Sequence, residues 1–340
     1  MSGALPQPPG GETVRRTAPA SPHRAAGRKR KSAMAREEAR AGLTLITPTL
    51  IIVVAVVVLP VAWTFLLAFQ DVGLMNIQSV GLFGSYTLQN FAGVLTEPGF
   101  VEALVTTVVY SVLGTAGAIG LGLVAALALR RSFRGQGFVR ASILLPYVAP
   151  VVAVTYVWRT TLNPQFGVVN HWGTELFGWD GPIAFLSEES RTVSLFGLDI
   201  GIPVALLTVI AFEAWRSFPF AFLFLSARIG AVPAELEEAA RVDGATPTQR
   251  FRYILLPQLV PTIAVLTVLR FIWTFNSFDD IYLLTGGGAG TEVVAVRVFN
   301  FLTARGDIGA AAAQALVLAT ILAVLVTVYL RQAGRREERA

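Results

Sequence analysis

The sequence predicts an all-α membrane protein, a polytopic bundle of six transmembrane helices with both termini in the cytoplasm. Of its 340 residues, 54% are hydrophobic and only 14% are charged, whereas soluble domains carry about 25% charged residues. Six apolar runs each reach the roughly 20 residues needed to cross a bilayer core. Lysine and arginine gather in alternate connections between these runs, which is typical of a protein with a fixed orientation in the membrane.

Three regions follow from the pattern: a basic tail at 1–41, a transmembrane domain at 42–330 and a short tail at 331–340. We expect the six spans at about 43–69, 102–129, 138–159, 200–227, 259–283 and 310–330. Segments 1–41, 130–140, 228–252 and 331–340 hold 21 of the 27 lysine and arginine residues. Because positive charge stays on the cytoplasmic side, both termini and the 228–252 connection are predicted to be cytoplasmic.

The first tail is polar and rich in Arg, Pro, Gly and Ser, a composition that predicts disorder. Its run Arg28-Lys29-Arg30-Lys31 resembles a nucleic-acid patch. A topological anchor beside the first span is the preferred interpretation, because the run precedes an apolar segment. We therefore expect membrane lipid as a partner and no nucleic acid.

Several kinds of chemistry are excluded. The chain has no cysteine, and its two histidines are His23 and His171, so we expect no metal site and no cofactor. A P-loop needs a lysine to hold phosphates. The sequence has only two lysines, Lys29 and Lys31, and neither follows the glycine-rich run 286–290. The chain is therefore predicted to be a non-catalytic subunit that does not hydrolyse ATP itself.

Glycine and proline mark the spans. The second span carries Gly114, Gly117, Gly120 and Gly122, and small residues let helices approach closely in a membrane. Prolines interrupt several spans, where they free a backbone carbonyl and bend the helix; they are Pro60, Pro146, Pro150, Pro203, Pro219 and Pro261. Ordinary bundle packing explains both features, and a moving hinge is the alternative.

The most informative stretch is the cytoplasmic connection 231–257, which reads as two short helices. Pro233 suits a first helical position, and Gly244 suits the left-handed residue that ends a helix. Thr246 and Pro247 then repeat the start signal, and Pro257 is expected to close the unit before the fifth span. An apolar ridge beside a carboxylate could enter a groove on a partner, but a solvated connector fits the composition equally well.

The spacing Glu-Ala-Ala-x3-Gly-x9-Ile-x-Leu-Pro resembles the signature loop of permeases of ATP-binding-cassette (ABC) importers. It falls on Glu238, Ala239, Ala240, Gly244, Ile254, Leu256 and Pro257. Flanking features resemble the carbohydrate permeases of the maltose, glycerol-phosphate and lactose group. They are Asn90-Phe91, Arg140, Leu145-Pro146, Trp158, Gly167-x-x-Asn170, Trp215-x3-Pro219-Phe220 and Asp280-Ile-Tyr-x-Leu-Thr285-Gly-Gly. The resemblance covers about residues 43–330.

The resemblance implies a permease subunit in a bacterial inner membrane that forms half of a translocation path for a sugar or oligosaccharide. The 231–257 loop, with its helix carrying Glu238, would couple an alternating-access cycle to a separate ATPase. The implied partners are a second homologous permease, two cytoplasmic ATP-binding subunits and an extracytoplasmic sugar-binding protein or lipoprotein.

Ionisable residues within membrane spans are costly and are functional candidates. Glu213 and Arg216 stand three residues apart on one helix face, so they can pair. From the residues alone, a structural ion pair and a ligand-binding role stay equally open. The resemblance places the substrate path at Glu213, Arg216, Ser217, Trp273, Thr274 and Ser277. Hydroxyl, carboxylate and guanidinium groups bond sugar hydroxyls, and an indole stacks on a sugar ring.

Two other functions remain to be tested. A secondary transporter or channel would need no ATPase and should show an ion-coupled site. A membrane enzyme would use Asp279 and Asp280 as a paired acid and base.

Overall fold

The computed structural model describes residue 3 and residues 33–82, 84–195 and 198–337. The chain divides into two compact units, Met1–Leu59 and Pro60–Ala340. Most of the tail predicted at 1–41 lies outside the described residues. Its described end is helical, because α1 (Ala33–Val53) begins before the predicted boundary.

The first apolar run forms one continuous helix made of α1, a π-helical turn (Val54–Val58) and α2 (Leu59–Ala68). Within its stretch Ala41–Ala68, the most apolar 18 residues have a mean hydropathy of 2.9. The π-turn ends two residues before Pro60. Proline supplies no N–H to the preceding turn, and a widened turn is one way to accommodate that loss.

Within the described residues, five helices are long and apolar enough to cross a membrane. Besides Ala41–Ala68 they are α4 (Phe100–Ala128), α8 (Val204–Gly230), the continuous run Pro247–Phe275 and Ile308–Gln332. A sixth crossing is present if a bent helix pair counts as one span. The prediction of a polytopic helical bundle is confirmed.

The third predicted span, 138–159, is not a single helix. It is divided into α5 (Gln136–Val148) and α6 (Val151–Thr161), which meet at an angle of 97°. Ala149 between them is extended, with φ −66° and ψ 143°, as expected for a residue that precedes a proline. Pro150 therefore causes a break that hydropathy alone could not show.

Other predicted boundaries also change. A hairpin of β1 (Arg191–Leu195) and β2 (Leu198–Ile202) occupies the start expected for the fourth span, so α8 begins at Val204. The fifth span ends at Phe275 rather than at 283, and α12 (Asp279–Thr285) follows as a separate helix. The last helix, α14 (Ile308–Glu337), continues into the segment predicted as the tail 331–340.

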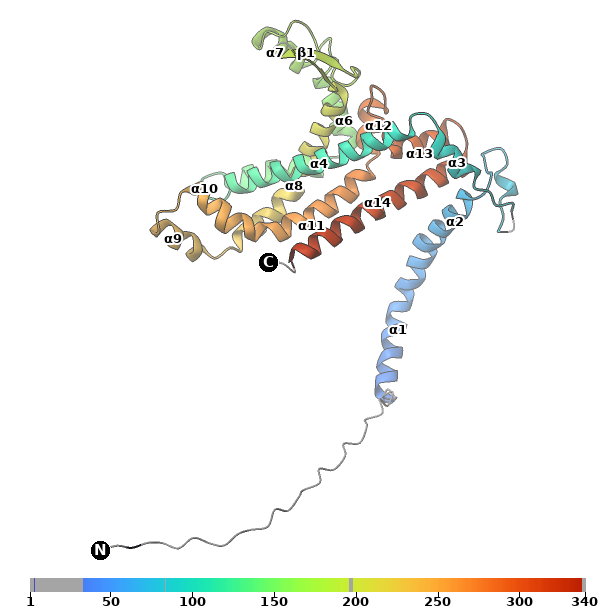
Figure 1. The fold of residues 1–340 in the computed structure, drawn as a ribbon, viewed down its shortest axis with the longest axis horizontal. Coiled ribbons are helices and arrows are strands. Elements are labelled where there is room, and N and C mark those ends of the chain that lie inside the picture. The colour runs from blue at the N-terminus through green and yellow to red at the C-terminus, as the bar shows by residue number, and fades with distance from the viewer. Residues whose placement is uncertain (1–2, 4–32, 83, 196–197, 338–340) are drawn as a thin grey trace. The chain divides into compact units, whose positions relative to one another are not determined.

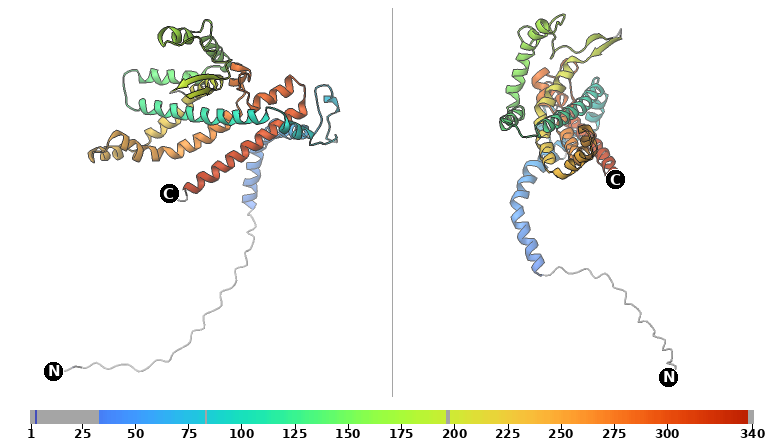
Figure 2. Two further views of the ribbon diagram at one scale, coloured as in Figure 1. Left: turned by 45° about the horizontal axis from the view of Figure 1, so that its top comes forward. Right: turned by 90° about the vertical axis from the view of Figure 1, so that its left-hand side faces the viewer.

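The run Pro247–Phe275 consists of α10 (Pro247–Arg250), a second π-turn (Phe251–Leu255) and α11 (Leu256–Phe275). The remaining elements are short connections at the two ends of the long helices: a 3₁₀ turn (Ile77–Ser79), α3 (Gln89–Thr96), α7 (Val168–Leu176), α9 (Ala234–Val242) and α13 (Val294–Thr303). α9 and α10 lie at one end of α4, α8 and α11, whereas α12 and α13 lie at the other (Figure 1). The same separation is visible in the turned views of Figure 2.

The most extensive helix–helix contact is between α4 and α8, and glycine makes it possible. A Cβ atom on Gly117 would lie 2.8 Å from Ala214 Cβ, and one on Gly122 would lie 2.7 Å from Ala221 Cβ. Gly114 likewise approaches Glu213, but Gly120 has nothing within 4 Å of a Cβ position. The predicted close packing is thus confirmed for three of the four glycines.

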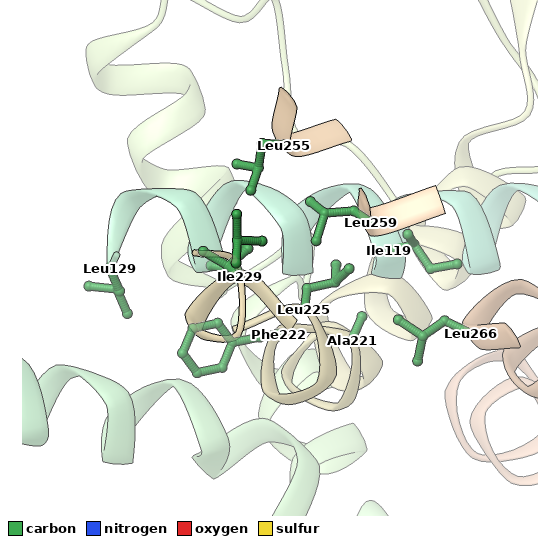
Figure 3. Close-up of a cluster of buried hydrophobic side chains, with 11 residues drawn as sticks. Ile119, Leu129, Ala221, Phe222, Leu225, Ile229, Leu255, Leu259 and Leu266 are labelled. Carbon is green, nitrogen blue, oxygen red and sulfur yellow. The ribbon is translucent and has the colours of Figure 1, made fainter. Parts of the chain in front are cut away.

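Aliphatic side chains from α4, α8 and α11 fill the half of this bundle nearest α9 and α10 (Figure 3). Leu225 and Leu259 are fully buried there, and Phe222 and Leu255 are nearly so. A second cluster near α12 is centred on Tyr110 and Phe212. The bundle end that carries α9 is therefore backed by a packed core.

Candidate functional site

Local signals build the two short helices of the 231–257 loop largely as the sequence predicts, although Pro233 stands one residue before the first helical position expected for it. Pro233 precedes α9 as its N-terminal cap, and Gly244 after it adopts φ +77°. Thr246 caps α10 through a capping box: the Gln249 backbone N–H donates to Thr246 Oγ1 at 3.3 Å, and the Thr246 N–H donates to Gln249 Oε1 at 2.7 Å. Pro247 takes the first helical position. Two start signals and one stop signal therefore fix the helix–turn–helix shape.

The register of α9 separates two adjacent glutamates. Glu237 turns toward the bundle, where its Oε1 lies 2.5 Å from Arg130 Nη1 just beyond α4. Glu238 and Ala239 are exposed, and Val242 on the same face is 88% exposed. Residues three and four apart share a helix face, so α9 presents a carboxylate with small and apolar neighbours outward. Ala240, expected in that outer ridge, is half-buried.

The end of the signature lies inside a helix rather than at its boundary. Ile254 falls in the second π-turn, and Leu256 and Pro257 begin α11. Because the helix runs from Pro247 to Phe275 without interruption, the expectation that Pro257 closes the loop is wrong. As at Pro60, a π-turn ends two residues before the proline. Leu255, which the pattern does not include, is the residue that enters the core.

A buried charged network occupies the other half of the bundle. Glu213 on α8 is 1% exposed, and its Oε1 forms an ion pair with Arg270 of α11. The same oxygen accepts hydrogen bonds from Thr274 Oγ1 at 2.9 Å and from Ser217 Oγ at 3.2 Å. Arg216 is farther away, at 3.7 Å from Glu213 Oε2. The predicted Glu213–Arg216 pair exists, but Arg270 is the closer partner.

Arg216 extends the network to α12. Its Nη2 donates to Asp280 Oδ2 at 2.9 Å, and Asp280 is fully buried. Tyr110 of α4 donates from its hydroxyl toward Asp280 Oδ2 at 3.4 Å and toward Ser277 Oγ at 3.5 Å. Two carboxylates and two guanidinium groups from α8, α11 and α12 thus balance in charge, and Tyr110 joins α4 to them. Asp279 is exposed, so it does not share the environment of Asp280.

Four of the six predicted substrate-path residues therefore lie together: Glu213, Arg216, Ser217 and Thr274. Ser277 lies at the edge of the network: its Oγ accepts from the Tyr110 hydroxyl at 3.5 Å, and its backbone N–H donates to the Thr274 carbonyl at 3.1 Å. Trp273 instead turns to the outside of the chain, where it is 46% exposed. Its ring lies 5.1 Å from that of Phe220 and 5.7 Å from the Arg270 guanidinium.

Sequence reasoning missed the tyrosine of this network and the aromatic side chains beside Trp273. Tyr110 stands one helical turn before Gly114, and its place on the close-packed face of α4 was a usable signal. Phe220 contacts Phe224 and Tyr147 as well as Trp273. Phe224, Tyr147 and Trp273 are each at least 41% exposed, so this surface of α5, α8 and α11 is aromatic and largely open in the single chain.

Comparison with known proteins identifies the family. Residues 118–336 match the model of the family described as "Binding-protein-dependent transport system inner membrane component". The chain is 32% identical over 287 residues to the inner membrane ABC transporter permease protein YcjO of Escherichia coli. The aligned region covers 84% of this chain and 91% of that protein. It is 31% identical over 299 residues to the trehalose/maltose transport system permease protein MalF of Thermococcus litoralis. This alignment covers 86% of this chain and 94% of that protein.

A solved structure shares the fold. One chain of a bacterial ABC transporter involved in the import of the acidic polysaccharide alginate superimposes with a TM-score of 0.74 at 22% identity, covering 89% of this chain and 99% of that chain. The predicted inner-membrane location agrees with the family. From the matched residues and the relatives, the chain belongs to the family of inner membrane components of binding-protein-dependent transport systems.

Proposed function

We propose that the chain is the permease subunit of an ABC importer that carries a sugar or oligosaccharide. We further propose that α9 couples ATP hydrolysis by a separate subunit to transport. The observation that carries the proposal is the outward face of α9, with Glu238 exposed while Glu237 holds the helix to Arg130. A helix fixed from behind and presenting a carboxylate in front suits a groove on a cytoplasmic partner.

The charge distribution supports a cytoplasmic position for α9. The basic connections 130–140 and 228–252 lie at the same end of the bundle, as the Arg130–Glu237 contact requires. The described part of α14 beyond Arg331 also runs to this end (Figure 1). Positive residues remain on the cytoplasmic side during membrane insertion, which puts α9 where an ATP-binding subunit can reach it.

The buried network provides the link from α9 to the transport path. α8 runs unbroken from Val204 to Gly230, so it joins Glu213 to the segment that leads into α9. Displacement of α9 would therefore move α8 relative to α11 and α12, across the Glu213–Arg270 and Arg216–Asp280 contacts. This is the two-state element that an alternating-access cycle needs.

Carbohydrate as the transported class rests on relatives and on chemistry. The relatives include permeases named for trehalose, maltose, sn-glycerol-3-phosphate and galactooligosaccharides. The network leaves Glu213 Oε2 and Asp280 Oδ1 without a hydrogen-bond partner among the described residues. Opening the helices would expose these acceptors to sugar hydroxyls, while Trp273 and Phe220 offer rings for stacking.

The implied partners are a second homologous permease, two ATP-binding subunits and an extracytoplasmic sugar-binding protein. The large exposed aromatic surface of α5, α8 and α11 suits contact with the second permease around a shared path. Domain limits of 1–41, 42–330 and 331–340 stay proposals, with the helix bounds given above.

The test separates an ATP-driven importer from a secondary transporter. The chain would be co-purified with its partner subunits, reconstituted in proteoliposomes and tested with a panel of sugars delivered by the binding protein. Uptake should stop when ATP or the ATP-binding subunit is removed and should continue when a proton uncoupler is added. Uptake that survives without the ATPase and collapses with the uncoupler would establish a secondary transporter instead.

A membrane enzyme is the weaker alternative. Asp280 is engaged by Arg216 and Tyr110, whereas Asp279 is exposed. An acid–base pair needs two carboxylates that can reach one reacting group, and these two lie in different surroundings.

A further inference from the structure

A cavity of about 490 Å³ lies behind α9, between the end of α4 and the start of α10. Four arginines line it: Arg130, Arg131, Arg241 and Arg250. Glu237 is the one acidic residue of the lining, and it is paired with Arg130 at 2.5 Å. The cavity therefore carries three positive charges that its own lining does not neutralise.

These three arginines lack acidic partners among the described residues, because no salt bridge within that part of the chain includes Arg131, Arg241 or Arg250. Arg250 is half-buried, and its Nε is enclosed without a hydrogen-bond partner. Like charges around one cavity repel each other and produce a positive potential that attracts anions. A guanidinium that is enclosed but unbonded indicates a missing acceptor.

The rest of the lining is apolar and comes from membrane-spanning helices. Leu127 and Ala128 end the span of α4, and Phe251 and Leu255 lie in the first turns of the span Pro247–Phe275. The cavity thus lies at the ends of two helices that are long and apolar enough to cross a membrane. An occupant that satisfies both parts of the lining has an anionic head and an apolar body.

We propose that this cavity binds the phosphate head group of an anionic membrane lipid. Arginine side chains hold phosphate oxygens through paired, charge-assisted hydrogen bonds, and basic pockets between helices on the cytoplasmic side bind anionic lipid head groups. The lipid would sit against Glu237 and Arg130, the contact that holds α9. The site does not depend on the transported substrate, so it stands if the sugar assignment fails.

The experiment compares two triple variants of the full-length chain. The cavity variant carries Arg131→Gln, Arg241→Gln and Arg250→Gln. The control carries Arg134→Gln, Arg252→Gln and Arg331→Gln, which removes the same charge at the same end from exposed residues outside the cavity lining. Each protein would be purified in uncharged detergent and titrated with phosphatidylglycerol or phosphatidylcholine of identical acyl chains. Native mass spectrometry would count the lipids retained.

The wild type and the control should retain phosphatidylglycerol in preference to phosphatidylcholine. The cavity variant should bind phosphatidylglycerol on the order of a hundredfold more weakly, since each arginine near a membrane surface contributes about fivefold in affinity. Inorganic phosphate at millimolar concentration should not displace the lipid. If circular dichroism shows that the cavity variant has lost helix, the single change Arg131→Gln against Arg134→Gln makes the same comparison with a smaller effect.

Three results would overturn the proposal. Equal losses in both triple variants would show a general attraction of positive charge to anionic lipid. Displacement of the lipid by phosphate would assign the cavity to a free anion. Unchanged lipid retention, together with lost co-purification of the ATP-binding subunit, would assign the arginines to a protein interface.

Discussion

Arg130 and Glu237 bring the end of α4 and the inner face of α9 together, with 2.5 Å between Nη1 and Oε1. The contact orients α9 so that the neighbouring Glu238 faces outward. The side chains are 33% and 12% exposed, and ion pairs of this kind contribute about 1 kcal/mol or less to stability. The pair therefore matters for the orientation of α9 more than for the stability of the fold.

Breaking this pair should affect coupling more than folding. We expect Arg130→Gln to lower substrate-driven uptake in reconstituted importer while changing the melting temperature by only about 2–4 °C. Arg134→Gln, which removes an exposed arginine from the same connection, is the control. The charge reversal Arg130→Glu combined with Glu237→Arg should recover part of the uptake. Equal uptake by Arg130→Gln and the control would show that the pair does not orient α9.

The glycines of α4 offer a matched test of helix packing. Gly122→Ala should destabilise the chain by about 1–3 kcal/mol, because the new Cβ would meet Ala221 Cβ at 2.7 Å and the Phe222 backbone nitrogen at 2.8 Å. Gly120→Ala should be neutral or stabilising, since nothing lies within 4 Å of its Cβ position. Thermal unfolding followed by tryptophan fluorescence in nanodiscs measures both. The same melting temperature for the two variants would contradict the α4–α8 contact.

The Glu213–Arg270 pair should behave as one buried unit. Either Glu213→Gln or Arg270→Met alone leaves a charge of the network uncompensated and should cost about 3–5 kcal/mol. The double variant should be more stable than the sum of the two single losses predicts, because both charges are then absent. A double-mutant cycle on the free energy of unfolding measures this coupling. Strictly additive losses would mean that the two side chains do not interact in the folded protein.

The aromatic surface around Trp273 is predicted to contact the transported sugar. Trp273→Ala should raise the substrate concentration needed for half-maximal uptake by about tenfold, since aromatic stacking and apolar contact are lost. Because the side chain is 46% exposed, the melting temperature should change little. Trp273→Phe should retain most of the affinity. If both variants keep wild-type affinity, the substrate path does not include this ring.

Local rules predicted the loop well. Gly244 and the Thr246-Pro247 start signal act over one helical turn, and the structure has both as expected. Hydropathy located the long helices but not the 97° bend at Pro150, because a sliding average responds to composition and not to direction. It also placed the end of the fifth span too late, because the apolar residues of α12 were averaged with those of α11 across the polar residues Asn276, Ser277, Asp279 and Asp280.

Contacts between distant segments could not be read from the sequence. Spacing on one helix face indicated Arg216 as the partner of Glu213, yet Arg270, 57 residues away, is closer. The Arg130–Glu237 contact likewise joins two cytoplasmic connections that spacing rules cannot relate. Resemblance named Glu238 as the coupling residue, and only the structure shows how its neighbour turns it outward.

The most direct test of the account is the uptake of substrate per ATP hydrolysed by Glu238→Ala in the complete reconstituted importer. Glu235→Ala is the control, because it removes an exposed carboxylate one turn earlier on α9 without touching the signature. We expect Glu238→Ala to lower the uptake per ATP hydrolysed by at least about tenfold, the loss of one charge-assisted hydrogen bond, while its helices stay folded and the control remains near the wild type. Uptake per ATP equal to that of the wild type would contradict the role of α9 as the coupling helix.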